Sequence, residues 1–226
     1  MLATHPDQCP RRGPSAHRNG DIEFTPLVTG PRGSPRNFEF TLATAGSGFS
    51  TPRHRHNFDQ VRIMLEGRFS FGRDQVQEPG TVGYFPEGCF YQQQGLGRSV
   101  TLLLQLGGAN GEGYMDFEQL YSGAEEIRRI GEFHDGIYTV RNPDGTLVNK
   151  DGHQAVWEHV FGRPLKFPRP RYQQAIIMDP DGYRWMPAPG DDVGVQRKLL
   201  GVFTERALGL WMLRLDAGAR HVLTGG

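Results

Sequence analysis

Three side chains that could bind a metal ion or a polar ligand lie close together in the first third of the chain. His54, His56 and Gln60 occupy positions i, i+2 and i+6. Side chains alternate between the two faces of a strand, so this spacing places all three on one face. Imidazole nitrogens are good ligands for several transition metals, whereas a neutral amide oxygen is a weak one. The pattern therefore predicts a site at which two imidazoles and an amide converge.

Arg62 extends this polar face, because it lies two residues beyond Gln60. A buried guanidinium needs an anion. The anion is either a carboxylate of the substrate or an internal acid, for which Asp59 and Glu39 are the candidates. Gln105, in an otherwise apolar run, adds an amide that could bind a polar ligand or face solvent at a strand end.

The segment 48–67 resembles the first motif of the cupin family, in which Gly, His-x-His, an acidic residue and a closing Gly occur at these intervals. The segment 80–94 resembles the second motif, with Tyr91 where the family usually has its third His. Gln93 shares the face of Tyr91. The resemblance implies an antiparallel jelly-roll β-barrel over residues 21–108 that binds Fe, Mn, Ni, Zn or Cu on three His and one Glu.

This chain departs from the cupin pattern at two of the four ligand positions, with Gln60 in place of Glu and Tyr91 in place of His. A tyrosine binds a metal well only as a phenolate, so its pKa of about 10 would have to be lowered. The resemblance implies a divalent metal ion, Fe, Mn, Ni or Zn, of unknown identity. The predicted residues are His54, His56, Gln60 and Tyr91 for the metal, Tyr91 and Arg62 for catalysis, and Arg62, Gln93 and Gln105 for the substrate.

Two functions from different classes follow from this site. One is a small-molecule enzyme, a metal-dependent oxygenase or isomerase with a degenerate metal site. The other is a metal-free cupin that binds a small polar metabolite without catalysis and uses the same four groups as hydrogen-bond partners. A third possibility is the remnant of a two-barrel protein whose role is assembly. The cupin fold hosts many activities, so the fold alone does not choose among them.

The composition favours β structure, because 31 Gly and 16 Pro separate short runs of β-branched and aromatic residues. We divide the chain into a flexible N-terminal arm (1–20), the barrel (21–108) and a helical and extended region (109–190). Residues 191–226 resemble the opening strands of a second cupin barrel, or strands that complete the first. Unpaired strands would expose an edge, so we expect them to pair with the barrel or with another subunit in a homodimer.

Local patterns predict individual elements. Alternation over 38–42 and the apolar run 99–106 indicate strands, and two apolar runs that meet at 66–67 predict a hairpin. Apolar residues spaced by three and four predict a helix that begins after Asp116 and extends to Ile130.

Asp151 is expected to cap a second helix that ends near Phe161. A lone histidine on a helix is usually exposed or satisfied in a core. We therefore expect no site role for the remaining histidines of this region, His134, His153 and His159.

The charge balance gives no sign of a nucleic-acid or membrane partner, because 25 basic residues offset 25 acidic ones. The two cysteines, Cys9 and Cys89, do not form a disulfide framework. The sequence begins without an apolar signal segment, and no apolar run approaches the roughly 18 residues that a membrane helix needs. We therefore expect a cytoplasmic protein whose partner is a small molecule.

Overall fold

The structure is a computed structural model of the chain. It divides into two compact units, Met1–Ile177 and Met178–Gly226. Neither α-helix in the described part of the chain is long and apolar enough to cross a membrane. The structure describes residues 4–18, 20–34, 36–108, 111, 113–187, 193–203 and 207–223.

The first unit is built around a six-stranded sheet with the order β1-β2-β8-β3-β6-β12. The pairs β1–β2, β2–β8, β3–β8 and β3–β6 are all antiparallel, which confirms the expected mainly β architecture. The strands are β1 (Ile22–Thr29), β2 (Phe38–Ala45), β3 (Phe58–Glu66), β6 (Val82–Phe85), β8 (Ser99–Gly107) and β12 (Ile176–Met178).

A smaller sheet with the order β5-β4-β7 provides the other wall of the barrel. Phe69 of β4 packs in one core cluster with Ile22 of β1, Ala45 of β2 and Met64 of β3, so the core lies between the two sheets. Apolar residues on the inner face of each sheet explain this packing. The strands are β4 (Phe69–Gly72), β5 (Gln75–Gln77) and β7 (Gln94–Gly95).

The hairpin predicted at 66–67 is wrong. β3 pairs with β6 and β8, whereas β4 pairs with β5 and β7, so the two apolar runs belong to different sheets. Gly67 has φ +68°, and a Cβ there would lie 2.1 Å from the carbonyl oxygen of Arg98. The left-handed glycine and this close approach redirect the chain from one sheet to the other.

The region after the barrel contains the two predicted helices, α1 (Phe117–Ile127) and α2 (Gly152–Phe161). Asp116 forms a capping box with Gln119, and Asp151 accepts a hydrogen bond from the amide of Gln154. The first helix ends at Ile127, and Ile130 is 69% exposed, so it is not part of the packed face.

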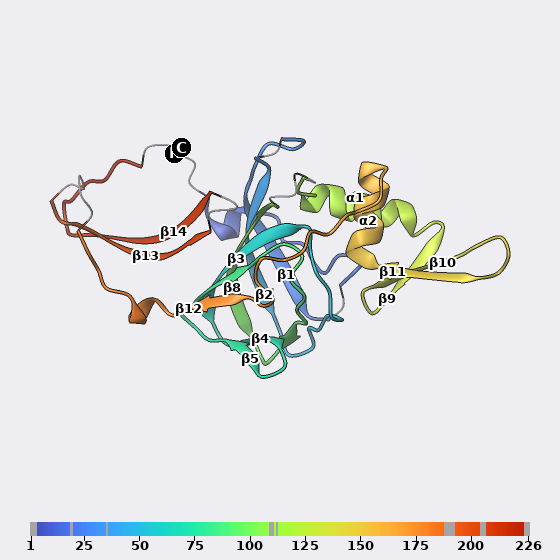
Figure 1. Cartoon of the computed structure of the whole chain (residues 1–226), viewed down its shortest axis with the longest axis horizontal. Coiled ribbons are helices and arrows are strands. Elements are labelled where there is room, and N and C mark those ends of the chain that lie inside the picture. Colours follow the sequence, from blue (N-terminus) through green and yellow to red (C-terminus); the bar gives the residue numbers. More distant parts are fainter. Residues whose placement is uncertain are drawn as a thin grey trace. The chain divides into compact units, whose positions relative to one another are not determined.

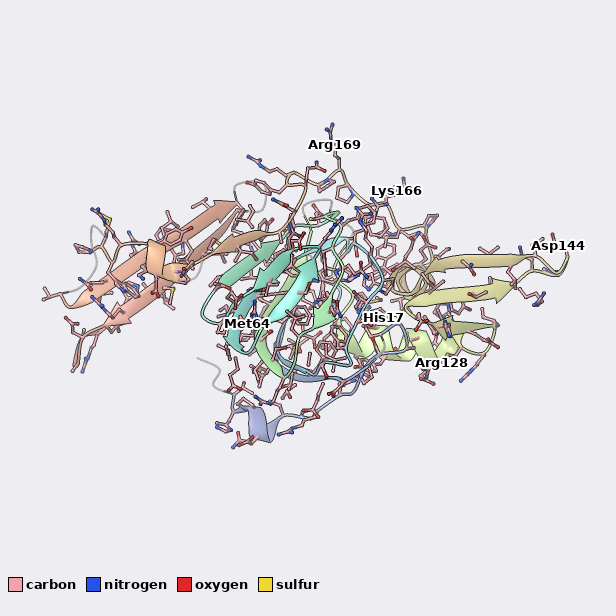
Figure 2. All side chains as sticks on the ribbon, turned by 90° about the horizontal axis from the view of Figure 1, so that it is seen from below. His17, Met64, Arg128, Asp144, Lys166 and Arg169 are labelled. Carbon is pink, nitrogen blue, oxygen red and sulfur yellow. The ribbon has the colours of Figure 1, made fainter. Side chains whose placement is uncertain are left out.

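The same region also contains a three-stranded sheet that the sequence patterns did not predict. Its order is β11-β10-β9, and it lies beside the two helices, with Asp144 near the tip of the β10–β11 hairpin (Figures 1 and 2). Trp157, fully buried, lies in the core that these elements share. The strands are β9 (Gly131–His134), β10 (Ile137–Arg141) and β11 (Leu147–Asp151).

The N-terminal segment, expected to be a flexible arm, has a defined path along the first unit. After a short 3₁₀ helix, η1 (Pro6–Gln8), the backbone of Arg12 exchanges two hydrogen bonds with Phe24 of β1, each 2.8 Å long. Ser15 and His17 are then buried. The free edge of β1 explains this course, because an unpaired strand edge offers backbone donors and acceptors.

The second unit contains a two-stranded antiparallel sheet of β13 (Val195–Phe203) and β14 (Leu208–Leu215), after a 3₁₀ helix η2 (Pro180–Gly182). The register shifts between Leu199 and Gly201, which marks a β-bulge. The strand-like character expected for the C-terminal residues is present, and the two strands pair with each other.

Candidate functional site

The barrel contains a cavity of about 80 Å³. Phe58, Gln60, Arg62 and Met64 of β3 all line it, as the alternation of side chains along a strand predicts. His17 of the N-terminal segment also lines it, and Figure 2 marks this residue and Met64. The cavity therefore contacts the inner face of the sheet and a segment outside the barrel strands.

The four predicted ligand residues lie together beside the cavity, and His56 and Gln60 line it. The Tyr91 hydroxyl lies 2.7 Å from Nδ1 of His56 and accepts a hydrogen bond of 3.0 Å from Nε2 of Gln60. Gln60 Nε2 lies 2.8 Å from the same His56 nitrogen. The rings of His54 and Tyr91 have centroids 4.5 Å apart, and a β-bridge joins the two residues.

Arg62 is only 5% exposed, and the groups that accept its hydrogen bonds are neutral. Gln60 Oε1 accepts from Nε at 3.0 Å and from Nη2 at 2.6 Å, and the Tyr91 hydroxyl accepts from Nη2 at 3.2 Å. The Gln93 amide oxygen, in the orientation that satisfies both groups, accepts from Nη1 and Nη2 at 2.8 and 2.9 Å. The ring of Phe85 stacks 4.1 Å from the guanidinium carbon. Among the described residues, neither Asp59 nor Glu39, the internal acids considered as partners of Arg62, contacts its guanidinium.

Gln105 also lines the cavity, where its side-chain oxygen accepts a 2.7 Å hydrogen bond from the Tyr114 hydroxyl. Tyr114 in turn lies 3.4 Å from Glu39 Oε2, and that carboxylate oxygen accepts from the amide of Phe117 at 2.9 Å. Burial raises the pKa of Glu39 to about 7. The structure thus places Gln93 and Gln105 at the same cavity, with Gln105 held by a tyrosine rather than facing solvent.

Three residues outside the predicted set complete the site. Arg18, partly buried, donates from Nη2 to Nε2 of His56 at 3.0 Å. His17 and His153 are buried, and the ring of His153 lies 5.0 Å from that of His56. His153 stands in the first turn of α2, so the expectation that it has no place at the site is wrong. The only local signal for Arg18 was its position just before the first barrel strand.

Four histidines at the site are buried: His17, His54, His56 and His153. Burial is the largest cause that lowers their pKa values, and the pKa of His153 falls to about 3. The positive charge of Arg18 lowers the pKa of each of the four further. These imidazoles are therefore neutral at physiological pH.

The donor set does not fit a metal ion. The lone pair of His56 Nε2 receives a guanidinium N–H, and Gln60 Oε1 accepts from Arg62, so neither atom is free to coordinate. Burial raises the pKa of Tyr91, which keeps it a neutral phenol. The guanidinium of Arg18 contacts His56 and that of Arg62 contacts Gln60 and Tyr91, so positive charge already lies against three of the four predicted ligand residues. Within the described part of the chain, no three His, Cys, Asp or Glu side chains form a metal-binding group.

The buried groups around His56 offer more hydrogen-bond donors than acceptors. If His56 carries its proton on Nε2, that N–H faces the N–H of Arg18. If the proton is on Nδ1, it donates to the Tyr91 hydroxyl oxygen at 2.7 Å, and the Gln60 N–H that faces the same nitrogen lacks an acceptor. In either tautomer one N–H lacks an acceptor, which is costly for a buried group. The site is therefore suited to a ligand that supplies acceptors.

No protein-family model matches the chain, and no curated protein matches it. Among solved structures it is similar to a protein proposed to be a dioxygenase from Nostoc punctiforme, with a TM-score of 0.50 and 13% identity over 94% of this chain and 54% of that one. It is also similar to an RmlC-like cupin protein from Ralstonia eutropha, with a TM-score of 0.42 and 14% identity over 74% of this chain and 92% of that one. A third similar structure is the polyketide cyclase RemF from Streptomyces resistomycificus, with a TM-score of 0.41 and 20% identity over 46% of this chain and 78% of that one.

Proposed function

Because the chain has the cupin fold but not a donor set suited to a metal ion, we propose that its barrel binds a small organic acid without a metal. This is the metal-free alternative that the sequence left open. The observation that carries the proposal is Arg18. Its guanidinium lines the cavity and carries several N–H donors, yet only Nη2 bonds to a described residue, His56.

The charge of the site supports an anionic ligand. Arg18 and Arg62 both line the cavity, and neither forms an ion pair with a described carboxylate. The charge of Asp151, which caps α2, acts on Arg18 without such contact. A buried positive charge without a counter-ion is unfavourable, so binding a carboxylate here removes an electrostatic cost. The same carboxylate supplies the acceptors that the hydrogen-bonded cluster lacks.

The rest of the ligand should be apolar. Ile22, Ala45, Phe49, Met64 and Phe69 form one core cluster, and all five line the cavity. The cavity is smaller than the cavity of about 150 Å³ that admits benzene in a protein core. It is therefore suited to a short-chain acid, with the carboxylate at the arginines and the chain against this cluster.

Titration calorimetry with short carboxylic acids tests the proposal, with the primary amide of each acid as the neutral comparison. We expect an acid of about two to four carbons to bind, because the cavity is about half the size of one that admits benzene. Its amide should bind at least tenfold more weakly, because hydrogen bonds to charged groups contribute about 1.5–3 kcal/mol. Replacing Arg18 with Gln should weaken acid binding to the same degree. Arg11→Gln is the matched control on the same segment, since Arg11 is exposed and pairs with Glu23.

Two results would reject the proposal. One is equal affinity for the acid and its amide, which would show that charge is not recognised. The other is unchanged acid affinity in the folded Arg18→Gln protein. Binding that requires an added divalent metal would favour the metal-dependent oxygenase or isomerase hypothesis instead.

A further inference from the structure

Four buried imidazoles form a cluster at this site, and Arg18 contacts one of them, His56. The ring of His56 lies 4.9 Å from that of His54 and 5.0 Å from that of His153, and His17 lies 5.8 Å from His153. The rings come from three separate segments: the N-terminal segment, the loop before β3, and α2. The positive charge of Arg18 acts on all four of them.

Two of these imidazoles direct lone pairs where a cation could use them. His54 donates from Nδ1 to the carbonyl oxygen of Pro52 at 2.8 Å, so its Nε2 carries the lone pair, and this buried atom has no partner among the described residues. His56 presents its Nε2 lone pair to Arg18 at 3.0 Å when its proton is on Nδ1. Neutral imidazoles with such lone pairs are good ligands for transition metals.

We propose that Arg18 is the resident cation of this histidine cluster and occupies the place that a metal ion takes on the corresponding histidines of other cupins. This goes beyond the proposed function, since it concerns what holds the cluster together and not which acid binds. Arg18 and a divalent ion cannot both use the Nε2 lone pair of His56, and like charges this close repel strongly in a poorly solvated site. Arg62 contacts Gln60 and Tyr91 instead, so it leaves this nitrogen free.

Two sets of contacts hold the N-terminal segment in place ahead of Arg18. Before it, the backbone of Arg12 pairs with β1, and its guanidinium donates to Glu118 of α1 at 2.9 Å. Next to it, His17 packs against Gly152, where an added Cβ would lie 2.6 Å from the His17 Cβ. An anchored segment thus places Arg18 at the cluster. Replacing Arg18 with an uncharged residue should leave the imidazoles free to bind a metal.

Cobalt binding to the untagged full-length protein tests this inference without any organic acid present. We expect the wild-type protein to show no visible d–d absorption from bound Co²⁺. Arg18→Ala should bind Co²⁺ at least a hundredfold more tightly and show this absorption. Arg18→Leu is the second variant, which preserves apolar volume if the alanine protein is unstable. Circular dichroism confirms that each variant is folded.

Three comparisons assign the gained metal to the cluster. Arg18→Lys retains a cation and should gain nothing, and Arg11→Ala removes a charge elsewhere on the segment and should also gain nothing. Adding His56→Ala to Arg18→Ala should abolish the gain. The inference is overturned if the wild-type protein binds Co²⁺ through His54 and His56, or if folded Arg18→Ala and Arg18→Leu bind no more tightly than wild type. Neither outcome bears on whether an acid binds.

Discussion

The buried neutral histidines predict that the first unit loses stability in mild acid. A histidine whose pKa is lowered in the folded state takes up a proton only on unfolding, so its contribution is constant above about pH 6.5 and is lost as the pH falls below that value. Between about pH 6.5 and pH 5.5, each such histidine lowers the free energy of unfolding by about 1 kcal/mol. The four histidines together account for about 4 kcal/mol.

Glu39 acts in the opposite direction. Its pKa is raised from 4.5 to about 7 in the folded state, so its contribution to stability is fully present below about pH 4.5 and is lost as the pH rises through about 7. Over the same fall in pH it restores about 1 kcal/mol. The net loss is therefore about 3 kcal/mol, a large part of the 5–15 kcal/mol that stabilises a typical domain.

Urea unfolding at a series of pH values measures this loss. The fluorescence of Trp157 reports on the first unit alone once the other tryptophans, Trp185 and Trp211, are replaced with Phe. His153→Gln should reduce the steepness of the pH dependence by about a third, because one of about three net protons is removed. His134→Gln should leave it unchanged, since His134 is exposed on β9. A wild-type stability that stays flat across this range, or an unaltered steepness in His153→Gln, would refute the reasoning.

Three further substitutions test separate parts of the structure. Tyr91→Phe removes a hydroxyl that accepts from two side chains, so it should lower the free energy of unfolding by about 1–3 kcal/mol in the urea assay. Tyr121→Phe is the control and should cost less, because the exposed Tyr121 hydroxyl donates to a backbone carbonyl. Ala43→Leu places a larger side chain in the cavity wall and should weaken binding of the acid at least tenfold in calorimetry. Unchanged affinity in this variant would contradict the assigned pocket. Asp116→Ala removes the cap of α1 and the partner of Arg32, so thermal unfolding should show a stability lower by about 1–2 kcal/mol. Asp116→Asn retains a capping side chain and should be destabilised less.

Much of the barrel could be predicted from local patterns. Alternation along β3 predicted that Gln60 and Arg62 share an inner face, and both line the cavity. The caps at Asp116 and Asp151 predicted where both helices begin. These features depend on residues a few positions apart, for which strand and helix periodicity are reliable physical guides.

The tertiary structure decided what the polar cluster is. Arg18 meets His56 from 38 positions away, and His153 meets Asn57 from 96 positions away, contacts that no periodicity encodes. The motif spacing of His54 and His56 is the same whether a metal ion or a guanidinium faces the imidazoles. Only the packing of the N-terminal segment and α2 against the barrel brings Arg18 to that position, because long-range pairing follows from the burial of whole elements and not from the local pattern of side chains.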